Sequence, residues 1–202
     1  MMDAPAILSA AVEGIVDEAV VRRLIVDAGG RPGTVYGRNG KQALRQKIDG
    51  YNNAALRAPW IVVVDLDHEC DCAPRLREAW LPRPAPHLCF RVAVRAIEAW
   101  LMADAETLAP FLGVGRSHVP RDPEAAADPK RELIDLARRS RRRAIREDMV
   151  PREGSGRRVG PAYSSTLIEY VGTRWRPKTA ARHAKSLRRA IACLERLIGA
   201  GA

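Results

Sequence analysis

The sequence contains no apolar run long enough to cross a membrane, although 47% of its 202 residues are hydrophobic. A membrane-spanning helix needs about 20 consecutive apolar residues, and no segment approaches this length. The first residues, MMDAPAILSA, lack the basic segment that opens a secretory signal peptide. These absences argue against a membrane or secreted protein, and we expect a soluble, cytoplasmic protein with no membrane partner.

Cysteine is also scarce. The four cysteines have no disulfide-scaffold spacing, which fits a reducing compartment. The segment DHECDC places His68 beside Cys70 and Cys72. A structural zinc site needs a second ligand pair, for which only His87 and Cys89 are candidates. We therefore favour a polar loop over a zinc site and keep His68 as a candidate contact to a substrate phosphate or a metal.

Positive charge is concentrated in the last third of the sequence. Residues 1–129 carry 15 Lys and Arg against 17 Asp and Glu, whereas residues 130–202 carry 19 against 7. A basic excess of this kind indicates a polyanionic partner, and nucleic acid is the first candidate. Aromatic residues make up only 5% of the chain, so a platform on which single-stranded bases stack is not expected.

Strand and helix patterns alternate in the first half of the chain. The segment WIVVVDLD has the β-branched character of a strand buried on both faces of a sheet. Alternation of strands with helices predicts an α/β fold, with a parallel sheet of about four strands flanked by helices. The expected strands are 6–12, 33–37, 60–67 and 87–94, and the expected helices are 15–28, 41–56, 74–81 and 95–103.

The second half of the chain is expected to be helical. We divide the chain into an α/β catalytic core, residues 1–115, and a basic all-α annex packed on it, residues 116–202. The last helix carries an apolar stripe that either packs on the core or forms a dimer, so the oligomeric state stays open. The expected helices are about 130–147, 162–174 and 178–198, and the stripe is Leu187, Ile191, Leu194 and Ile198.

Acidic residues stand where the expected strands end. Glu13 follows the first strand, and Asp65 and Asp67 end the third. Glu98 lies just past the fourth strand, and Asp17 lies one helical turn beyond Glu13. Because parallel strands end at the same edge of a sheet, we expect these side chains to converge. Repulsion between their carboxylates would be reduced by a bound cation, and oxygen ligands favour Mg²⁺ or Mn²⁺. The alternative is that an acid such as Asp17 only stabilises the N-terminus of its helix, as acids do in any protein.

The two acidic motifs together resemble the Toprim domain, which topoisomerases, bacterial primases and OLD-family nucleases share. The motifs are VEGIVD, from Val12 to Asp17, and VDLD, from Val64 to Asp67. The segments FRVAVRAIEAWLMADAETLAPFLGV and GSGRRVGPAY are also similar to a family of bacterial Toprim-like proteins of unknown function. A topoisomerase tyrosine domain, a primase zinc ribbon or an OLD-type ATPase domain does not fit within 202 residues. The resemblance therefore implies a nuclease that acts alone or with a separate ATPase subunit.

The resemblance also implies a role for each matched residue. Glu13 corresponds to the Toprim glutamate, a metal ligand or general acid/base, and Asp65 and Asp67 correspond to the metal-binding DxD pair. Asp17 corresponds to an additional acid of OLD-like nucleases, and Glu98 is a further candidate ligand. The implied activity is Mg²⁺- or Mn²⁺-dependent hydrolysis of phosphodiester bonds, in defence against phage or other mobile DNA.

A Gly- and Arg-rich segment, REGSGRRVGP, is a candidate loop for substrate phosphates. Backbone N–H groups of Gly154 and Gly156 and the guanidinium groups of Arg157 and Arg158 can surround a phosphate. Lys130, at the start of the basic region, is a further candidate contact. The segment lacks the Lys-Ser/Thr that closes a nucleotide-binding P-loop, and an ordinary flexible connection is the alternative.

Two rival functions stay open. A haloacid-dehalogenase-like phosphatase also ends a hydrophobic strand in DxD, but the segment DLDHE lacks the hydroxyl residue usual two places after the second Asp. Glu13 would also have no role in such an enzyme. The other rival is a non-catalytic nucleic-acid- or partner-binding subunit, whose acids hold a structural ion or cap helices.

Overall fold

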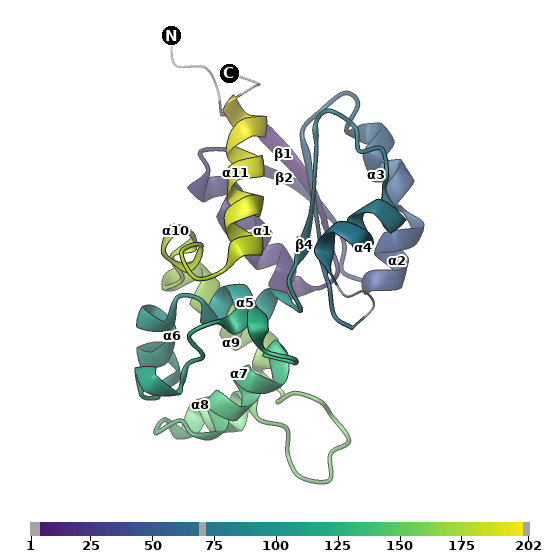
Figure 1. Ribbon diagram of the computed structural model, residues 1–202. Coiled ribbons are helices and arrows are strands. Elements are labelled where there is room, and N and C mark those ends of the chain that lie inside the picture. The colour runs from purple at the N-terminus through teal and green to yellow at the C-terminus, as the bar shows by residue number, and fades with distance from the viewer. Residues whose placement is uncertain (1–4, 69–71, 200–202) are drawn as a thin grey trace.

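The computed structural model describes residues 5–68 and 72–199, and its centre is a four-stranded sheet (Figure 1). The strands are β1 (Ile7–Val12), β2 (Arg31–Gly37), β3 (Trp60–Asp65) and β4 (Leu88–Ala93), in the spatial order β2-β1-β3-β4. All neighbouring strands run parallel. The predicted α/β fold, a parallel sheet flanked by helices, is therefore confirmed.

Helices cover both faces of the sheet and form the lower half of the molecule in Figure 1. They are α1 (Ile15–Asp27), α2 (Lys41–Gln46), α3 (Ile48–Ala54), α4 (Ala73–Trp80), α5 (Ile97–Met102), α6 (Ala105–Leu112), α7 (Pro129–Arg138), α8 (Arg143–Met149), α9 (Tyr163–Thr173), α10 (Pro177–Ala180) and α11 (Lys185–Gly199). Two 3-10 turns, η1 (Arg116–His118) and η2 (Pro123–Ala125), lie between α6 and α7. Within the described residues, no helix combines the length and the apolar character that crossing a membrane requires.

Two of the expected helices are each divided in two by a local break. The expected helix 41–56 is interrupted at Lys47, whose backbone (φ −105°, ψ 1°) leaves the helical region. The expected helix 130–147 is interrupted at Ser140. The Ser140 hydroxyl donates to the Leu112 carbonyl and accepts from the Arg142 N–H, so a side chain replaces the helical backbone hydrogen bonds there.

The expected helix 178–198 is also divided, into α10 and α11, because a distant carboxylate starts a new helix. Glu124 in η2 accepts hydrogen bonds from the backbone N–H groups of Lys185 (2.8 Å) and Ser186 (2.9 Å). These are N–H groups of the first turn of α11, which have no partner within the helix. A contact across about 60 residues therefore sets this helix boundary, and no local pattern indicates it.

The sheet separates two hydrophobic cores. On one face, side chains such as Val62, Val64 and Phe90 pack with residues of α2, α3 and α4. On the other face, Ile61 and Val63 belong to a larger core. This core also contains residues of α1 and of every helix from α5 to α11. Because β3 is buried on both sides, its side chains show no polar alternation.

The last helix, α11, packs on this larger core. Leu187 and Leu194 are fully buried and Ile191 is 9% exposed. The helix contacts β4 and α1, and α9 also packs along α1. The apolar stripe is therefore covered within the chain, and the helices of residues 116–199 share a continuous core with the sheet.

The cysteines of the described residues are all free thiols. Cys89 on β4 and Cys193 on α11 are buried beside each other, so Cys89 does not join His68 in a zinc site. Cys72 precedes α4 and is partly buried, and Cys70 lies outside the described residues.

A buried ion pair fastens the segment before α10 to the start of α6. The Asp104 side chain, which is 0% exposed, receives a hydrogen bond from Arg176 Nη2 (2.6 Å) and others from Arg176 Nε and N (3.0 Å each). The Thr107 hydroxyl donates to the same carboxylate. Burial would raise the pKa of Asp104, but the hydrogen bonds from Arg176 and Thr107 outweigh burial and lower that pKa.

We predict that Arg176→Ala lowers the free energy of unfolding at neutral pH, because the Asp104 carboxylate would stay buried without its charged partner. Since the pair lowers the pKa of Asp104 below 3.8, its stabilisation is complete above that pH and is lost as pH falls through the lowered value. Urea unfolding at neutral and acidic pH measures both effects. Arg174→Ala, which alters an exposed neighbour, is the control, and an equal loss in both variants would contradict the prediction.

Candidate active site

Two acids, Glu13 directly after β1 and Asp65 at the end of β3, connect the carboxyl ends of neighbouring strands through hydrogen bonds. Glu13, directly after β1, accepts a hydrogen bond through Oε1 from the backbone N–H of Asp65 (2.8 Å). Asp65, the last residue of β3, accepts through Oδ1 from the backbone N–H of Ile97 (2.9 Å). Ile97 begins α5, which follows β4, so the two carboxylates connect the ends of three strands.

Asp17 lies in the first turn of α1 at the same edge and is only 8% exposed. Its Oδ1 atom is buried and has no hydrogen-bond partner among the described residues. Gly14 makes room for this side chain, because a Cβ atom at position 14 would lie 2.9 Å from Asp17 Oδ2. The glycine of the VEG segment is therefore required by the space that the Asp17 carboxylate occupies.

Glu98, in the first turn of α5, is 3% exposed. The Tyr163 hydroxyl at the start of α9 donates to Glu98 Oε1 (3.1 Å). Lys130 Nζ, from the first turn of α7, lies 3.5 Å from the same oxygen. The helical second half of the chain thus supplies both the hydroxyl and the cation that contact this carboxylate.

Three of the predicted acids, Asp17, Asp65 and Glu98, line one cavity of about 340 Å³ at the strand ends. Lys130 and Arg38 line it as well, so the cavity contains groups of both signs. The volume lies near the lower end of the about 300–1000 Å³ that small-molecule pockets span. Glu13 lies next to this cavity, through its hydrogen bond to Asp65.

Asp67, the second acid of the DxD segment, pairs with Lys41, whereas Glu98 pairs with Lys130. Its side chain is 50% exposed, and its Oδ2 atom lies 3.0 Å from Lys41 Nζ. Lys41 also donates to the backbone carbonyl of Asp65 (2.6 Å). The left-handed backbone of Asp67 (φ 50°) and a hydrogen bond from Arg95 to its carbonyl fix this turn. The structure therefore brings Asp67 beside Lys41 and outside the carboxylate cavity.

The crowded carboxylates hold protons more tightly than free ones. Burial, followed by repulsion from Asp17, raises the pKa of Glu13 to about 7, although the Asp65 N–H and Lys41 act in the opposite direction. Burial and then repulsion from Glu98 raise the pKa of Asp17 to about 6. Burial, Asp17 and Glu98 together raise the pKa of Asp65 well above its ordinary value. The attraction of Glu98 raises the pKa of Lys130, which keeps this ammonium group charged.

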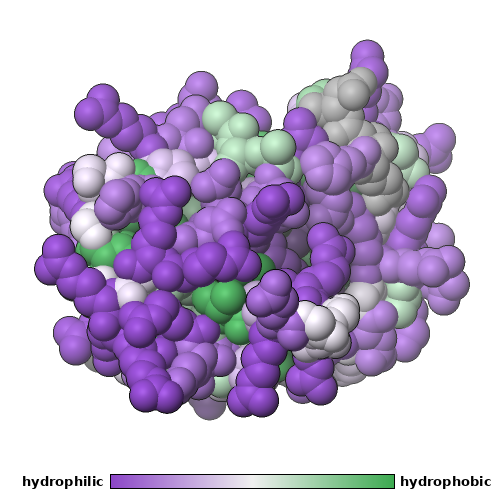
Figure 2. Space-filling view, turned by 90° about the horizontal axis from the view of Figure 1, so that it is seen from below, coloured by the Kyte–Doolittle hydropathy of each residue, from purple (hydrophilic) through white to green (hydrophobic). Residues whose placement is uncertain are grey.

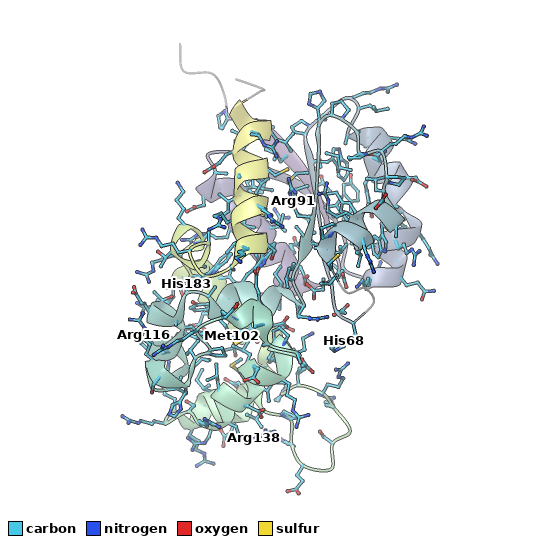
Figure 3. All side chains as sticks on the ribbon, in the orientation of Figure 1. His68, Arg91, Met102, Arg116, Arg138 and His183 are labelled. Atoms are coloured by element: carbon cyan, nitrogen blue, oxygen red, sulfur yellow. The ribbon has the colours of Figure 1, made fainter. Side chains whose placement is uncertain are left out.

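The Gly- and Arg-rich loop, which projects beside α7 and α8 (Figure 1), contributes unevenly to the cavities near the acids. Arg158 and Lys130 both line a neighbouring cavity of about 320 Å³. Gly154 and Gly156 have positive φ (74° and 64°), and Arg157 is exposed and lines neither cavity. His68 is exposed and also lies outside both cavities (Figure 3).

Hydrophilic residues cover most of the molecular face seen from below, on the side of α7, α8 and the loop (Figure 2). Several arginines on this side are already paired with nearby acids. Arg138 pairs with Asp135, and Arg143 Nε lies 2.7 Å from Glu147 Oε1. Part of the positive charge of this region is therefore offset locally, and Lys130 and Arg158 are the predicted phosphate contacts that line cavities.

The donor chemistry of the acidic cavity fits a hard divalent cation. All three of its acids offer carboxylate oxygens, and the buried Asp17 Oδ1 has no partner in the described structure. Within residues 5–68 and 72–199, however, no three His, Cys, Asp or Glu side chains approach closely enough to share one metal ion. Asp17, Asp65 and Glu98, with Glu13 beside them, are the residues that would hold Mg²⁺ or Mn²⁺, and their carboxylates would have to move closer together to share one ion.

Comparisons of the chain with protein-family models, with curated proteins and with solved structures give no match.

Three residues of the site were not anticipated from the sequence. Lys41 and Arg38 follow β2, whose end meets the same sheet edge, so the strand-end rule that selects the acids also selects these cations. Tyr163 belongs to α9, far from the acids in sequence, and no local signal marks it.

The raised pKa values predict that the metal-free protein loses stability as pH rises. A carboxyl group with a higher pKa in the folded state binds more protons when folded, so stability falls as this group ionises. For Asp17 the loss falls between pH 3.8 and about 6. Asp17→Asn is therefore expected to raise the free energy of unfolding by about 2–3 kcal/mol above this range and to change it little below.

Denaturant unfolding across this pH range, with a chelator present, measures the effect. Asp49→Asn, which alters an exposed acid of α3, is the matched control and should change stability little at any pH. A gain of the same size at every pH in Asp17→Asn would contradict the assignment of the raised pKa to this carboxyl group.

Proposed function

We propose that the protein is a Mg²⁺- or Mn²⁺-dependent phosphodiesterase that cleaves nucleic acid at the carboxyl edge of its sheet. The observation that carries this proposal is that Asp17, Asp65 and Glu98 line one cavity. The buried Oδ1 atom of Asp17 has no hydrogen-bond partner among the described residues. Buried like charges are costly unless a cation neutralises them. Lys130 alone supplies one positive charge in contact with this group, so a further cation is expected.

Glu13 is suited to move a proton during hydrolysis. Its raised pKa of about 7 lets it take up or release a proton near neutral pH, which is the condition under which an acid/base catalyst works best. The hydrogen bond from the Asp65 N–H fixes the position of one carboxyl oxygen. A bound divalent cation would lower the pKa of the attacking water and offset charge on the phosphate.

The cations of the site are suited to hold the substrate. Lys130 and Arg38 line the acidic cavity, and Lys41 pairs with Asp67 outside it. A polyanionic substrate would otherwise be repelled by the carboxylates, so positive groups at the rim favour its approach. Arg158, in the cavity that shares Lys130, would extend this contact to a neighbouring phosphate of the strand.

The resemblance to Toprim nucleases supports the same assignment through the VEGIVD and VDLD segments. It suggests a role in defence against phage or other mobile DNA, alone or with a separate ATPase subunit. This biological role is an analogy to the family and does not follow from the site.

A phosphatase that uses Asp65 as its nucleophile is less well supported. The second acid of the DxD segment, Asp67, is paired with Lys41 and lies outside the cavity. A non-catalytic nucleic-acid-binding subunit is the remaining rival, and substitution of the acids distinguishes it from an enzyme.

We predict that Glu13→Gln and Asp65→Asn each reduce Mn²⁺-dependent cleavage of labelled DNA or RNA by about 100-fold or more, because they remove the proton-transfer and metal-binding groups. Binding of the same nucleic acids should be retained. Asp49→Asn serves as the control for loss of an exposed acid. Full cleavage by Glu13→Gln would contradict the role of Glu13 in proton transfer, and no cleavage by the unaltered protein with any nucleic acid would count against an enzyme.

We also predict that Mn²⁺ binds at the acidic cavity and raises the melting temperature, since a ligand that binds only the folded state stabilises it, by about 2.7 kcal/mol at 100 times its Kd. Asp65→Asn and Glu98→Gln should lose this stabilisation. Anomalous scattering from Mn²⁺-soaked crystals would locate the ion. Peaks found only away from Asp17, Asp65 and Glu98 would contradict the proposed site.

A further inference from the structure

A second group of cations lies along β4, the edge strand of the sheet. Here α4 flanks the strand on one face and α11 on the other, and a cavity of about 190 Å³ lies between them. Arg77 of α4, Arg91 of β4, and Lys185 and Arg189 of α11 line it. It shares no lining residue with the carboxylate cavity, so it is a separate feature of the molecule.

Carboxylates do not offset the charge of this second cavity, although Arg91 lies beside Cys193, whose pKa is lowered to about 6 by the hydrogen bond with Cys89 and by the charge of Arg91. None of its four cations forms an ion pair with a described residue. Its one acid, Glu124, already accepts hydrogen bonds from the backbone N–H groups of Lys185 and Ser186. The N-terminus of α11 is thereby capped, and the guanidinium groups are left as the donors that face a ligand.

Two of these donors are buried and unsatisfied. Arg77 Nε and Arg91 Nε are both inaccessible to solvent and have no hydrogen-bond partner in the described structure. Arg91 lies between α11 and the sheet (Figure 3), and its guanidinium group also lies beside the thiols of Cys89 and Cys193. Buried N–H donors are almost always paired, so two orphans on arginines that line one cavity point to an acceptor there, which each Nε would reach after a movement of its side chain.

The shape and the donors of the cavity define the acceptor. Its volume is below the about 300–1000 Å³ of pockets for drug-sized molecules, so it suits one small group rather than a whole nucleotide. Guanidinium groups bind phosphate oxygens with paired hydrogen bonds and are strongly favoured at such sites. We propose that this cavity is a phosphate-binding site, in which Arg77, Arg91 and Arg189 hold a single phosphate group.

The phosphate can belong to a nucleic acid backbone or to a small phosphorylated molecule, because the chemistry of recognition is the same. The proposal does not depend on catalysis at the carboxylate edge. Its test is therefore carried out with a chelator present, so that the metal-dependent activity plays no part. Glu13→Gln should bind phosphate in this cavity as the unaltered protein does.

The test is titration of the full chain with inorganic phosphate, followed by two-dimensional NMR. Saturable shifts are expected at the backbone amides of Val92, Val94 and Ser186, which line the cavity. Arg77→Gln and Arg189→Ala should each weaken this binding by about tenfold or more, since each removes a charged hydrogen-bond donor. Arg188→Ala, which removes an exposed arginine of the same helix outside the cavity, is the matched control.

A short DNA oligonucleotide identifies the source of the phosphate. If the oligonucleotide displaces inorganic phosphate and its own binding weakens in Arg189→Ala, the site holds a backbone phosphate. If phosphate binds and the oligonucleotide does not compete, the ligand is a small phosphorylated molecule. The proposal is overturned if these amides show no saturable shifts with either probe, or if Arg188→Ala weakens binding as much as Arg189→Ala. The NMR spectrum of each variant also reports whether its fold is intact.

Discussion

Negative charge gathered at one edge of a parallel sheet is the constraint on which the rest of the structure depends. In addition to burial, the charge of Glu98 raises the pKa of Asp17, and the charges of Asp17 and Glu98 both raise the pKa of Asp65. Two lysines offset part of this negative charge: Lys130 contacts Glu98, and Lys41 acts to lower the pKa of Glu13 against the burial that raises it. The first turn of α7, which packs on α5, brings this ammonium group to Glu98.

The sheet and its acidic edge were predictable because their signals are local. The apolar segment of β3 and the acids that follow β1 and β3 can be identified within a few residues of sequence. Parallel topology then implies that the acids meet, which is true of Asp17, Asp65 and Glu98. The separation of Asp67 from this group was not predictable. It depends on the left-handed backbone of Asp67 and on the position of Lys41 in the connection between β2 and β3.

Contacts over long sequence distances explain what the sequence analysis missed. The start of α11 depends on Glu124, and Tyr163 contacts Glu98 across 65 residues. Neither pairing leaves a trace in local periodicity, because hydrophobic spacing shows which face of a helix is buried but not which partner it meets. The same limit applies to the basic cavity, whose arginines come from three separate elements and appear in the sequence as ordinary surface charge.

The packing of α11 on the sheet has a consequence for how the chain folds. The hydrophobic side chains of β4 and α1 that α11 covers are synthesised long before the helix itself, so during translation this face of the sheet stays open to water. Contacts between segments so distant in sequence form slowly, because a large loop must close first. An unfinished chain therefore carries an exposed apolar surface beside an unpaired edge strand, a combination that favours aggregation and calls for protection until the last helix has emerged from the ribosome.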